Sequence, residues 1–161
     1  MRIGIDFDRV LFKTDRFKEE VLFEEIDGFE ETYSQIDGVY SPEKHAEILE
    51  IPVEDILQIL EKASEYLYDD VELLKKSEHE FVIVTRGDPI FQKEKLEHSG
   101  ILKLVEEHKI VQEEDKDVKD IDILVDDLKS EIEKADIKGY HFERPDDSIQ
   151  DLLDFIDGEN S

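Results

Sequence analysis

The sequence contains no cysteine, which excludes disulfide bonds and zinc sites built from thiolates. Its five histidines are scattered without the spacing of metal ligands, so zinc chemistry is not expected. It also lacks any apolar run that approaches the ~18 residues of a membrane span, and it starts in a predicted strand rather than in a basic and then apolar leader. We therefore expect a cytoplasmic protein that does not cross a membrane.

Basic residues are scarce: 20 Lys and Arg stand against 46 Asp and Glu, which gives a formal net charge of −26. A surface this acidic repels a phosphate backbone, so we do not expect long nucleic acid as a partner. Two explanations of the acidity stay open. The protein could work in a salt-rich cytoplasm, where salt screens the self-repulsion, or it could be an acidic protein of an ordinary cytoplasm.

The order of the predicted elements indicates an α/β fold. At 161 residues the chain has the size of one domain with a modest insertion. Short apolar runs alternate with helical patterns after residue 69, which predicts a Rossmann-like, three-layer α/β/α core with a mainly parallel sheet. Within residues 14–68, helical spacing appears in two stretches on either side of an aromatic and acidic segment. We therefore assign residues 1–13 and 69–161 to the core and residues 14–68 to an insertion of two to four helices.

Polar residues follow three of the predicted strands at the end where ligand sites of parallel sheets lie. Asp6 and Asp8 end the first strand, Thr85 ends a second, and the Asp126-Asp127 pair ends a third. Taken singly, each has a simpler explanation: a strand end that turns polar at the surface, the β-propensity of threonine, or a solvated helix start. The three together, in this order, indicate a functional site.

The chemistry of these side chains suits a phosphate and a divalent cation. The hydroxyl of Thr85 and the backbone N–H groups that follow it, from Arg86 onward, can donate to phosphate oxygens. The adjacent carboxylates Asp126 and Asp127 repel each other, and a divalent cation would compensate for this repulsion. Magnesium takes its ligands from one or two carboxylates, a substrate phosphate and water, so it is the expected cofactor.

Three segments resemble motifs of the haloacid dehalogenase superfamily. Residues 3–12 resemble its first motif, residues 81–88 its second and residues 123–127 its fourth, so the resemblance covers roughly residues 1–14 and 71–142. The third motif is a lysine, for which Lys109, Lys116 and Lys119 are candidates. We favour Lys116, whose spacing to Asp126 resembles the 5′-nucleotidase-like branch, and keep Lys119 as the second choice.

The resemblance implies a Mg²⁺-dependent phosphatase that acts on a small phosphorylated metabolite. Asp6 would be the nucleophile and Asp8 the general acid and base. Substrate phosphate would lie on Thr85, Arg86 and Lys116. The metal ligands would be Asp6, the main-chain carbonyl of Asp8, Asp126 and Asp127. Rival hypotheses are a non-catalytic protein that binds a phosphorylated ligand and a phosphotransferase or nucleic-acid end-processing enzyme, and oligomeric state stays open.

The resemblance also implies that the helical insertion is a small cap that selects the substrate. Phe29, Tyr33, Tyr40 and Lys44 are possible contacts there, although aromatic residues in a small cap more often form its core, so none is assigned. The chain departs from the family at Arg9, where glycine is common after the second aspartate. An arginine at this position either contacts substrate or crowds the turn.

Overall fold

The computed structural model describes residues 1–159, and its strands form one parallel sheet in the order β3-β2-β1-β4-β5. The strands are β1 (Arg2–Ile5), β2 (Glu80–Arg86), β3 (His108–Val111), β4 (Ile123–Asp126) and β5 (Lys138–His141). The predicted α/β fold with a parallel sheet is therefore confirmed. Residues 160 and 161 of the expected core segment 69–161 lie outside the described residues.

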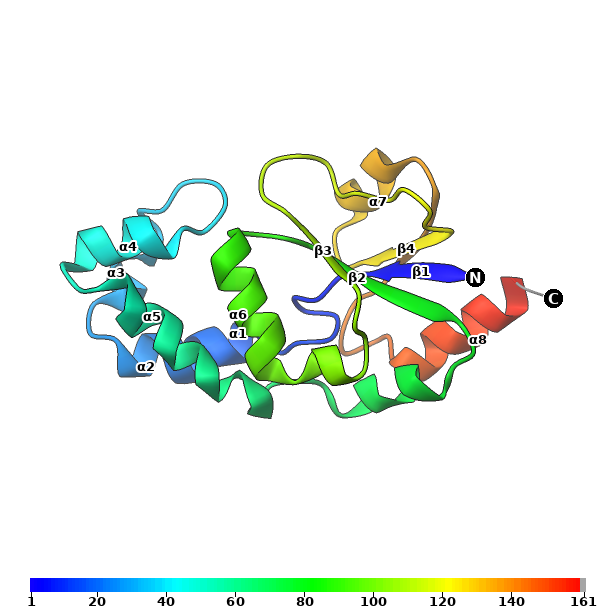
Figure 1. Cartoon of the computed structure of the whole chain (residues 1–161), viewed down its shortest axis with the longest axis horizontal. Coiled ribbons are helices and arrows are strands. Elements are labelled where there is room, and N and C mark those ends of the chain that lie inside the picture. The colour runs from blue at the N-terminus through cyan, green and yellow to red at the C-terminus, as the bar shows by residue number, and fades with distance from the viewer. Residues whose placement is uncertain (160–161) are drawn as a thin grey trace.

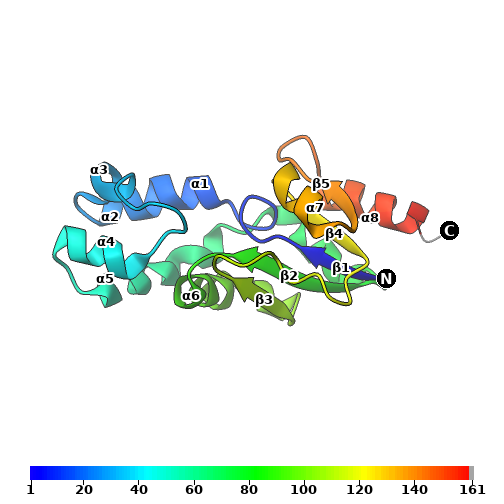
Figure 2. The same cartoon turned by 90° about the horizontal axis from the view of Figure 1, so that it is seen from above.

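The sheet is apolar on both faces because alternate strand residues point to opposite sides. Ile83 packs in the larger hydrophobic cluster, whereas its neighbours Val82 and Val84 pack in a second cluster with Leu124 and Ala135. Helix α7 (Lys129–Ala135) covers this second face, and α6 (Pro89–Ser99) and α8 (Ile149–Glu159) contribute to the first. Figure 1 shows α7 on one side of the strands and α8 on the other, and Figure 2 shows the same elements from above.

Helix α6 begins directly after the loop that follows β2. The side chain of Asp88 accepts a hydrogen bond from the backbone N–H of Phe91 at 3.0 Å, and Pro89 occupies the first helical position. The helix ends at Gly100, whose φ of 89° needs a residue without a side chain. The short helix η4 (Ile101–Lys103) follows.

The insertion between β1 and β2 forms four continuous helical runs, the upper end of the expected two to four. The first consists of α1 (Thr14–Phe17), the π-helical turn η1 (Lys18–Leu22) and α2 (Phe23–Glu25); the others are α3 (Phe29–Tyr33), α4 (Pro42–Leu49), and α5 (Val53–Ile59) continued by η2 (Leu60–Glu65). Figure 1 shows α1–α5 at one end of an elongated molecule, with α8 toward the other. Helix η3 (Asp69–Lys76) then leads back to β2.

The chain enters and leaves this helical segment at neighbouring points. The backbone N–H of Lys13 donates to the carbonyl of Tyr66 at 2.7 Å, and that of Tyr68 donates to the carbonyl of Leu11 at 3.0 Å. Phe12 and Leu67 form an antiparallel β-bridge between these two bonds. The two connections to the core are therefore paired side by side.

Arg144 holds several core segments together near these connections. Its guanidinium donates to both carboxylate oxygens of Asp70 at 2.7 and 2.8 Å, and to the carbonyl of Val10 at 3.0 and 3.1 Å. It also lies 4.1 Å from the ring centroid of Tyr68. None of the helices within residues 1–159 combines the length and the apolar character needed to span a lipid bilayer.

Candidate active site

The predicted site residues meet at the carboxyl ends of the three central strands. Asp6 follows β1 and keeps its backbone N–H bonded to the carbonyl of Val125 at 2.9 Å, so it continues the sheet. Asp126 is the last residue of β4, and Thr85 lies near the end of β2. Because β1 lies between β2 and β4, these residues come from three adjacent strands. They lie at the same edge of the sheet, the one formed by the carboxyl ends of the strands, which we call the strand edge.

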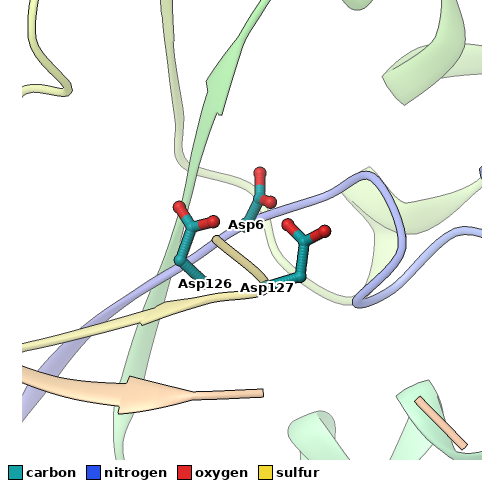
Figure 3. A group of neighbouring side chains, drawn as sticks. All are labelled: Asp6, Asp126 and Asp127. Carbon is teal, nitrogen blue, oxygen red and sulfur yellow. The ribbon is translucent and has the colours of Figure 1, made fainter. Parts of the chain in front are cut away.

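Three carboxylates form a compact cluster at this edge. Asp6, Asp126 and Asp127 each place an oxygen within 4.8 Å of the others. Figure 3 shows the three carboxyl groups directed to the same side of the strand ends. Asp126 is fully buried and Asp6 is 6% exposed, so water screens their repulsion poorly.

Lys116 is the lysine that the fold brings to this cluster. Its Nζ donates to Oδ2 of Asp126 at 2.5 Å and to Oδ1 of Asp6 at 3.2 Å, and its side chain is buried. Lys119, the second candidate, is exposed, and its backbone carbonyl accepts a bond from the ammonium group of Lys109 at 3.2 Å. The geometry therefore favours Lys116 over both alternatives as the lysine of the site.

The donor set fits a divalent cation. With all three carboxylates ionised, the cluster and the ammonium group of Lys116 would together carry two negative charges in a largely buried place. Burial raises the pKa of Asp6 well above its usual value and also raises the pKa of Asp126, although the charge of Lys116 opposes both shifts. A cation that takes oxygen ligands would relieve this excess charge, so Asp6, Asp126 and Asp127 are suitable metal ligands.

Asp8 turns its carboxylate away from the acidic cluster toward helix α6. Its Oδ1 accepts hydrogen bonds from Nζ of Lys95 at 2.8 Å and from Oγ1 of Thr14 at 2.9 Å, and its Oδ2 accepts one from Gln92 at 3.1 Å. Burial alone would raise the pKa of Asp8, but the charge of Lys95 and these hydrogen bonds outweigh it and lower the pKa. The contact expected between Asp8 and the metal is through the main-chain carbonyl and does not involve this carboxylate; it stays a prediction.

Gln92 connects Asp8 to Thr85. Its Nε2 group also donates to Oγ1 of Thr85 at 2.9 Å, so the threonine hydroxyl keeps its own proton free to donate. A side-chain Cβ at Gly87 would collide with Gln92, which explains a glycine directly after this strand. Lys95 and Gln92 were not among the residues predicted from the sequence.

Solved structures share this fold, although no protein-family model and no curated protein matches the chain. A haloacid dehalogenase-like family hydrolase from Xanthomonas campestris covers 100% of this chain and 94% of its own, with a TM-score of 0.54 and 16% identity. A Burkholderia xenovorans protein described as a haloacid dehalogenase-like hydrolase covers 83% of this chain and 76% of its own, with a TM-score of 0.62 and 16% identity. The chain has the haloacid dehalogenase fold. The predicted resemblance is thus confirmed as a fold, while the 5′-nucleotidase-like branch stays a prediction.

The backbone at Arg9, directly after the Asp-x-Asp segment, is unusual. This residue has a φ of 66°, in the left-handed region where glycine is favoured and where other residues are strained by about 1 kcal/mol. Its N–H donates to the carbonyl of Phe12 at 3.0 Å and to Oγ1 of Thr14 at 3.1 Å. Its guanidinium pairs with Asp15 at 3.0 Å, a contact in which both side chains are about half exposed.

Arg86, expected at the substrate phosphate, has its side chain in other contacts. The guanidinium pairs with the buried carboxylate of Glu131 at 3.0 Å and donates to the carbonyls of Gln112 at 3.3 Å and Glu114 at 2.7 Å. Arg86 therefore supports the loop that carries Lys116. A contact between Arg86 and phosphate stays a prediction.

A cavity of about 460 Å³ lies between the segment that follows β1, at Asp8 and Arg9, and the helical segment. Asp8, Gln92 and Lys95 line it from the core. The helical segment contributes aromatic rings and one lysine: Phe17, Lys18, Phe29, Tyr33 and Tyr40. Of the possible cap contacts, Phe29, Tyr33 and Tyr40 thus reach the cavity, whereas Lys44 lies on the exposed surface of α4.

Proposed function

We propose that this chain is a Mg²⁺-dependent phosphatase that hydrolyses a small phosphomonoester through a phosphorylated Asp6. The observation that carries the proposal is the group formed by Asp6, Asp126, Asp127 and Lys116 at the carboxyl ends of the strands, in which all but the half-buried Asp127 are buried. Such a group combines a carboxylate nucleophile with the positive charge that a phosphate dianion needs nearby. Both similar structures are described as hydrolases, which supports the same class for this chain.

In the first half of the proposed reaction, a carboxylate oxygen of Asp6 attacks phosphorus. An oxygen–phosphorus bond forms to Asp6 while the ester P–O bond breaks, and the leaving alkoxide takes a proton from Asp8. Asp8 must hold that proton when the ester arrives. The approach of an anionic ester raises the pKa of a neighbouring carboxyl group, which opposes the lowering by Lys95.

In the second half, the ionised Asp8 takes a proton from water, and the resulting hydroxide attacks the phosphorus. The bond between phosphorus and Asp6 breaks, inorganic phosphate leaves, and Asp8 has regained its proton. The hydroxyl of Thr85 and the ammonium group of Lys116 donate to the phosphoryl oxygens through both halves. Lys95 and Gln92 hold the Asp8 carboxylate in place during these proton transfers.

Asp6, Asp126 and Asp127 would hold Mg²⁺, together with the main-chain carbonyl of Asp8. The bound ion supplies positive charge that offsets the repulsion between the carboxylate of Asp6 and the phosphate dianion. The helical segment would act as the cap of the site, since its residues form one wall of the cavity.

A panel of phosphomonoesters assayed for phosphate release tests this function. We expect release that depends on Mg²⁺ and stops with a chelator. Asp6→Asn should reduce the rate by at least about a thousandfold and leave the fold intact, because it removes the nucleophile but preserves the side-chain shape. Asp146→Asn, a change of the same kind at an exposed position, is the matched control and should keep the parental rate.

The rival functions predict different results from the same panel. Binding of phosphate esters without turnover of any of them would indicate a non-catalytic binding protein. Transfer of the phosphoryl group to an added alcohol faster than to water would indicate a phosphotransferase. Selective release from the ends of short oligonucleotides would indicate an end-processing enzyme.

A further inference from the structure

The cavity wall contributed by the helical segment is mainly aromatic. Tyr33 and Tyr40 stack with ring centroids 5.4 Å apart, and Tyr40 also contacts Phe91 of helix α6 at 5.0 Å. Both tyrosine side chains are partly exposed at the cavity. A flat apolar group lying against these rings would bury aromatic surface, which favours binding.

The charges around the cavity are opposite in sign to those of the whole chain. Its lining contains four basic residues and two acidic ones, although the chain carries 46 acidic residues and 20 basic ones. Three of the four cations already have carboxylate partners: Arg9 pairs with Asp15, Arg86 with Glu131, and Lys95 with Asp8. Lys18 forms no ion pair within residues 1–159.

Lys18 occupies a special position in the helical segment. It begins the π-helical turn η1, and such turns in helices occur frequently at functional sites. Its Nζ lies 4.7 Å from the ring centroid of Tyr33, so the ammonium group is held over the aromatic wall. A lysine without a carboxylate partner in so acidic a protein is a ready binding group for an anion.

Arg9 provides a second cation for the same purpose. Its left-handed backbone is the kind of strain that persists at functional sites, where another requirement outweighs the cost. Its partner Asp15 is exposed, and an exposed ion pair contributes little, so a ligand anion can compete for the guanidinium.

We propose that the substrate of this site carries, in its leaving group, both an aromatic ring and a second anionic group that binds Lys18 and Arg9. This inference rests on the proposed phosphatase function and specifies its substrate class. The ester phosphate lies at the strand edge with Asp6 and Lys116, the ring lies against Tyr33 and Tyr40, and the second anion lies on Lys18. The second anion is a carboxylate or another phosphate, since both accept from an ammonium group.

Phosphonates that cannot be hydrolysed test the inference by binding, measured by calorimetry in the presence of Mg²⁺. Benzylphosphonate has the ring alone, and 3-phosphonopropionate has two anions without a ring. 4-(Phosphonomethyl)benzoate has the ring and a carboxylate, and 1,4-xylylenediphosphonate has the ring and a second phosphonate. We expect one of the last two to bind at least about tenfold more tightly than either reference compound, equivalent to about 1.4 kcal/mol.

Variants assign this advantage to Lys18. Lys18→Met should reduce the ratio of dissociation constants between benzylphosphonate and the better dianionic aryl ligand to below about threefold. Lys93→Met removes an exposed lysine of α6 outside the cavity and should preserve the ratio. Should Lys18→Met not fold, Lys18→Gln serves in its place, and the comparison of the four ligands in the parent protein needs no variant.

Equal binding of benzylphosphonate and the dianionic aryl ligands would overturn the inference, and so would an advantage that persists in Lys18→Met. Tight binding of 3-phosphonopropionate would overturn the part that concerns the ring. These measurements do not depend on turnover. Failure of the phosphate-release panel would therefore contradict the proposed function separately, whereas ester turnover without an advantage for dianionic ligands would contradict this inference alone.

Discussion

Nζ of Lys95 lies 2.8 Å from Oδ1 of Asp8, although 87 positions separate the two residues in the sequence. Both side chains are largely buried, with 6% and 20% of their surfaces exposed. The proposed acid and base of the reaction therefore faces a fixed positive charge from helix α6, in addition to the lysine at the acidic cluster. The charge of Lys95 lowers the pKa of Asp8, and the pH dependence of the reaction should report this shift.

Replacing Lys95 with methionine should raise the pKa of Asp8, because burial then acts without the opposing charge. Cleavage of an alkyl ester needs Asp8 protonated, so the descending limb of kcat/KM against pH should move to higher pH in Lys95→Met. The ester p-nitrophenyl phosphate is an internal control, since its leaving group departs without a proton. An unchanged descending limb for the alkyl ester would contradict the role of Lys95, and Lys93→Met should match the parent.

The favoured lysine of the third motif and the second choice should respond differently to substitution. Lys116→Ala leaves the buried carboxylates of Asp6 and Asp126 without their ammonium partner, so we expect phosphate release to fall by about a hundredfold or more. Lys119→Ala changes an exposed side chain and should alter neither the rate nor, beyond about 0.5 kcal/mol, the stability. The reverse ranking in steady-state kinetics would move the motif to Lys119.

Much of the site could be predicted from sequence because its signals are local. A short apolar run followed by Asp6, Thr85 or Asp126 indicates a strand and its polar end together, and parallel strands bring such ends to one edge. The choice of Lys116 rested on its position in the loop after a short strand and on its spacing to Asp126, which resembles the 5′-nucleotidase-like branch. These residues can be recognised from the short segments around them, without knowledge of any contact between distant parts of the chain.

Lys95 and Gln92 could not be predicted, because nothing local marks them as internal. The buried face of α6 includes Gln92, Lys95 and Ser99 beside Phe91 and Leu96, so it does not show an apolar stripe. Their partners Asp8 and Thr85 belong to other elements, and single-sequence reasoning gives no contact between them. The spacing of Gln92 and Lys95 by one helical turn was the available signal, but many surface helices share it.

Magnesium should stabilise the folded protein through the acidic cluster. A ligand that binds only the folded state adds about 2.7 kcal/mol at a hundred times its dissociation constant, so calorimetry at fixed ionic strength should show a higher melting temperature. Asp126→Asn should remove this increment, because it takes a charged oxygen from the cluster. Monovalent salt should still raise the melting temperature of the variant by screening its acidic surface.

The control for this measurement is Asp146→Asn, which removes one exposed charge and leaves the cluster intact. It should keep the full magnesium increment. If Asp126→Asn and the parent instead show equal shifts with magnesium, the ion acts by screening and the proposed metal site is wrong.

The ion pair of Asp70 with Arg144 should make stability depend on acid pH. Burial raises the pKa of Asp70, but hydrogen bonds from Arg144 and from the N–H of Ile149 outweigh it and lower the pKa in the folded state. The contribution of Asp70 to the free energy of unfolding is therefore complete above its pKa in the unfolded chain, about 3.9. It is lost as the pH falls through the lower pKa of the folded state. Asp70→Asn should lower the free energy of unfolding, measured with urea at neutral pH, by about 2 kcal/mol.

The difference in the free energy of unfolding between Asp70→Asn and the parent should shrink as the pH falls below about 3.9, the pKa of the unfolded chain, because the parent then loses the same charge. Asp69→Asn, at the exposed neighbouring position, should stay within about 0.5 kcal/mol of the parent at every pH. If this difference between Asp70→Asn and the parent stayed constant down to acid pH, hydrogen bonding without charge would account for the stability that the pair contributes.

The pairing of Phe12 with Leu67 has a consequence for the history of this chain. The backbone enters and leaves the helical segment through adjacent, hydrogen-bonded positions, so a two-residue turn could join them directly. Segments whose ends meet in this way are gained, lost or exchanged without disturbing the host sheet. Under the proposed function, exchange of this segment by recombination would change one wall of the substrate cavity while the strand ends that carry Asp6 stay the same.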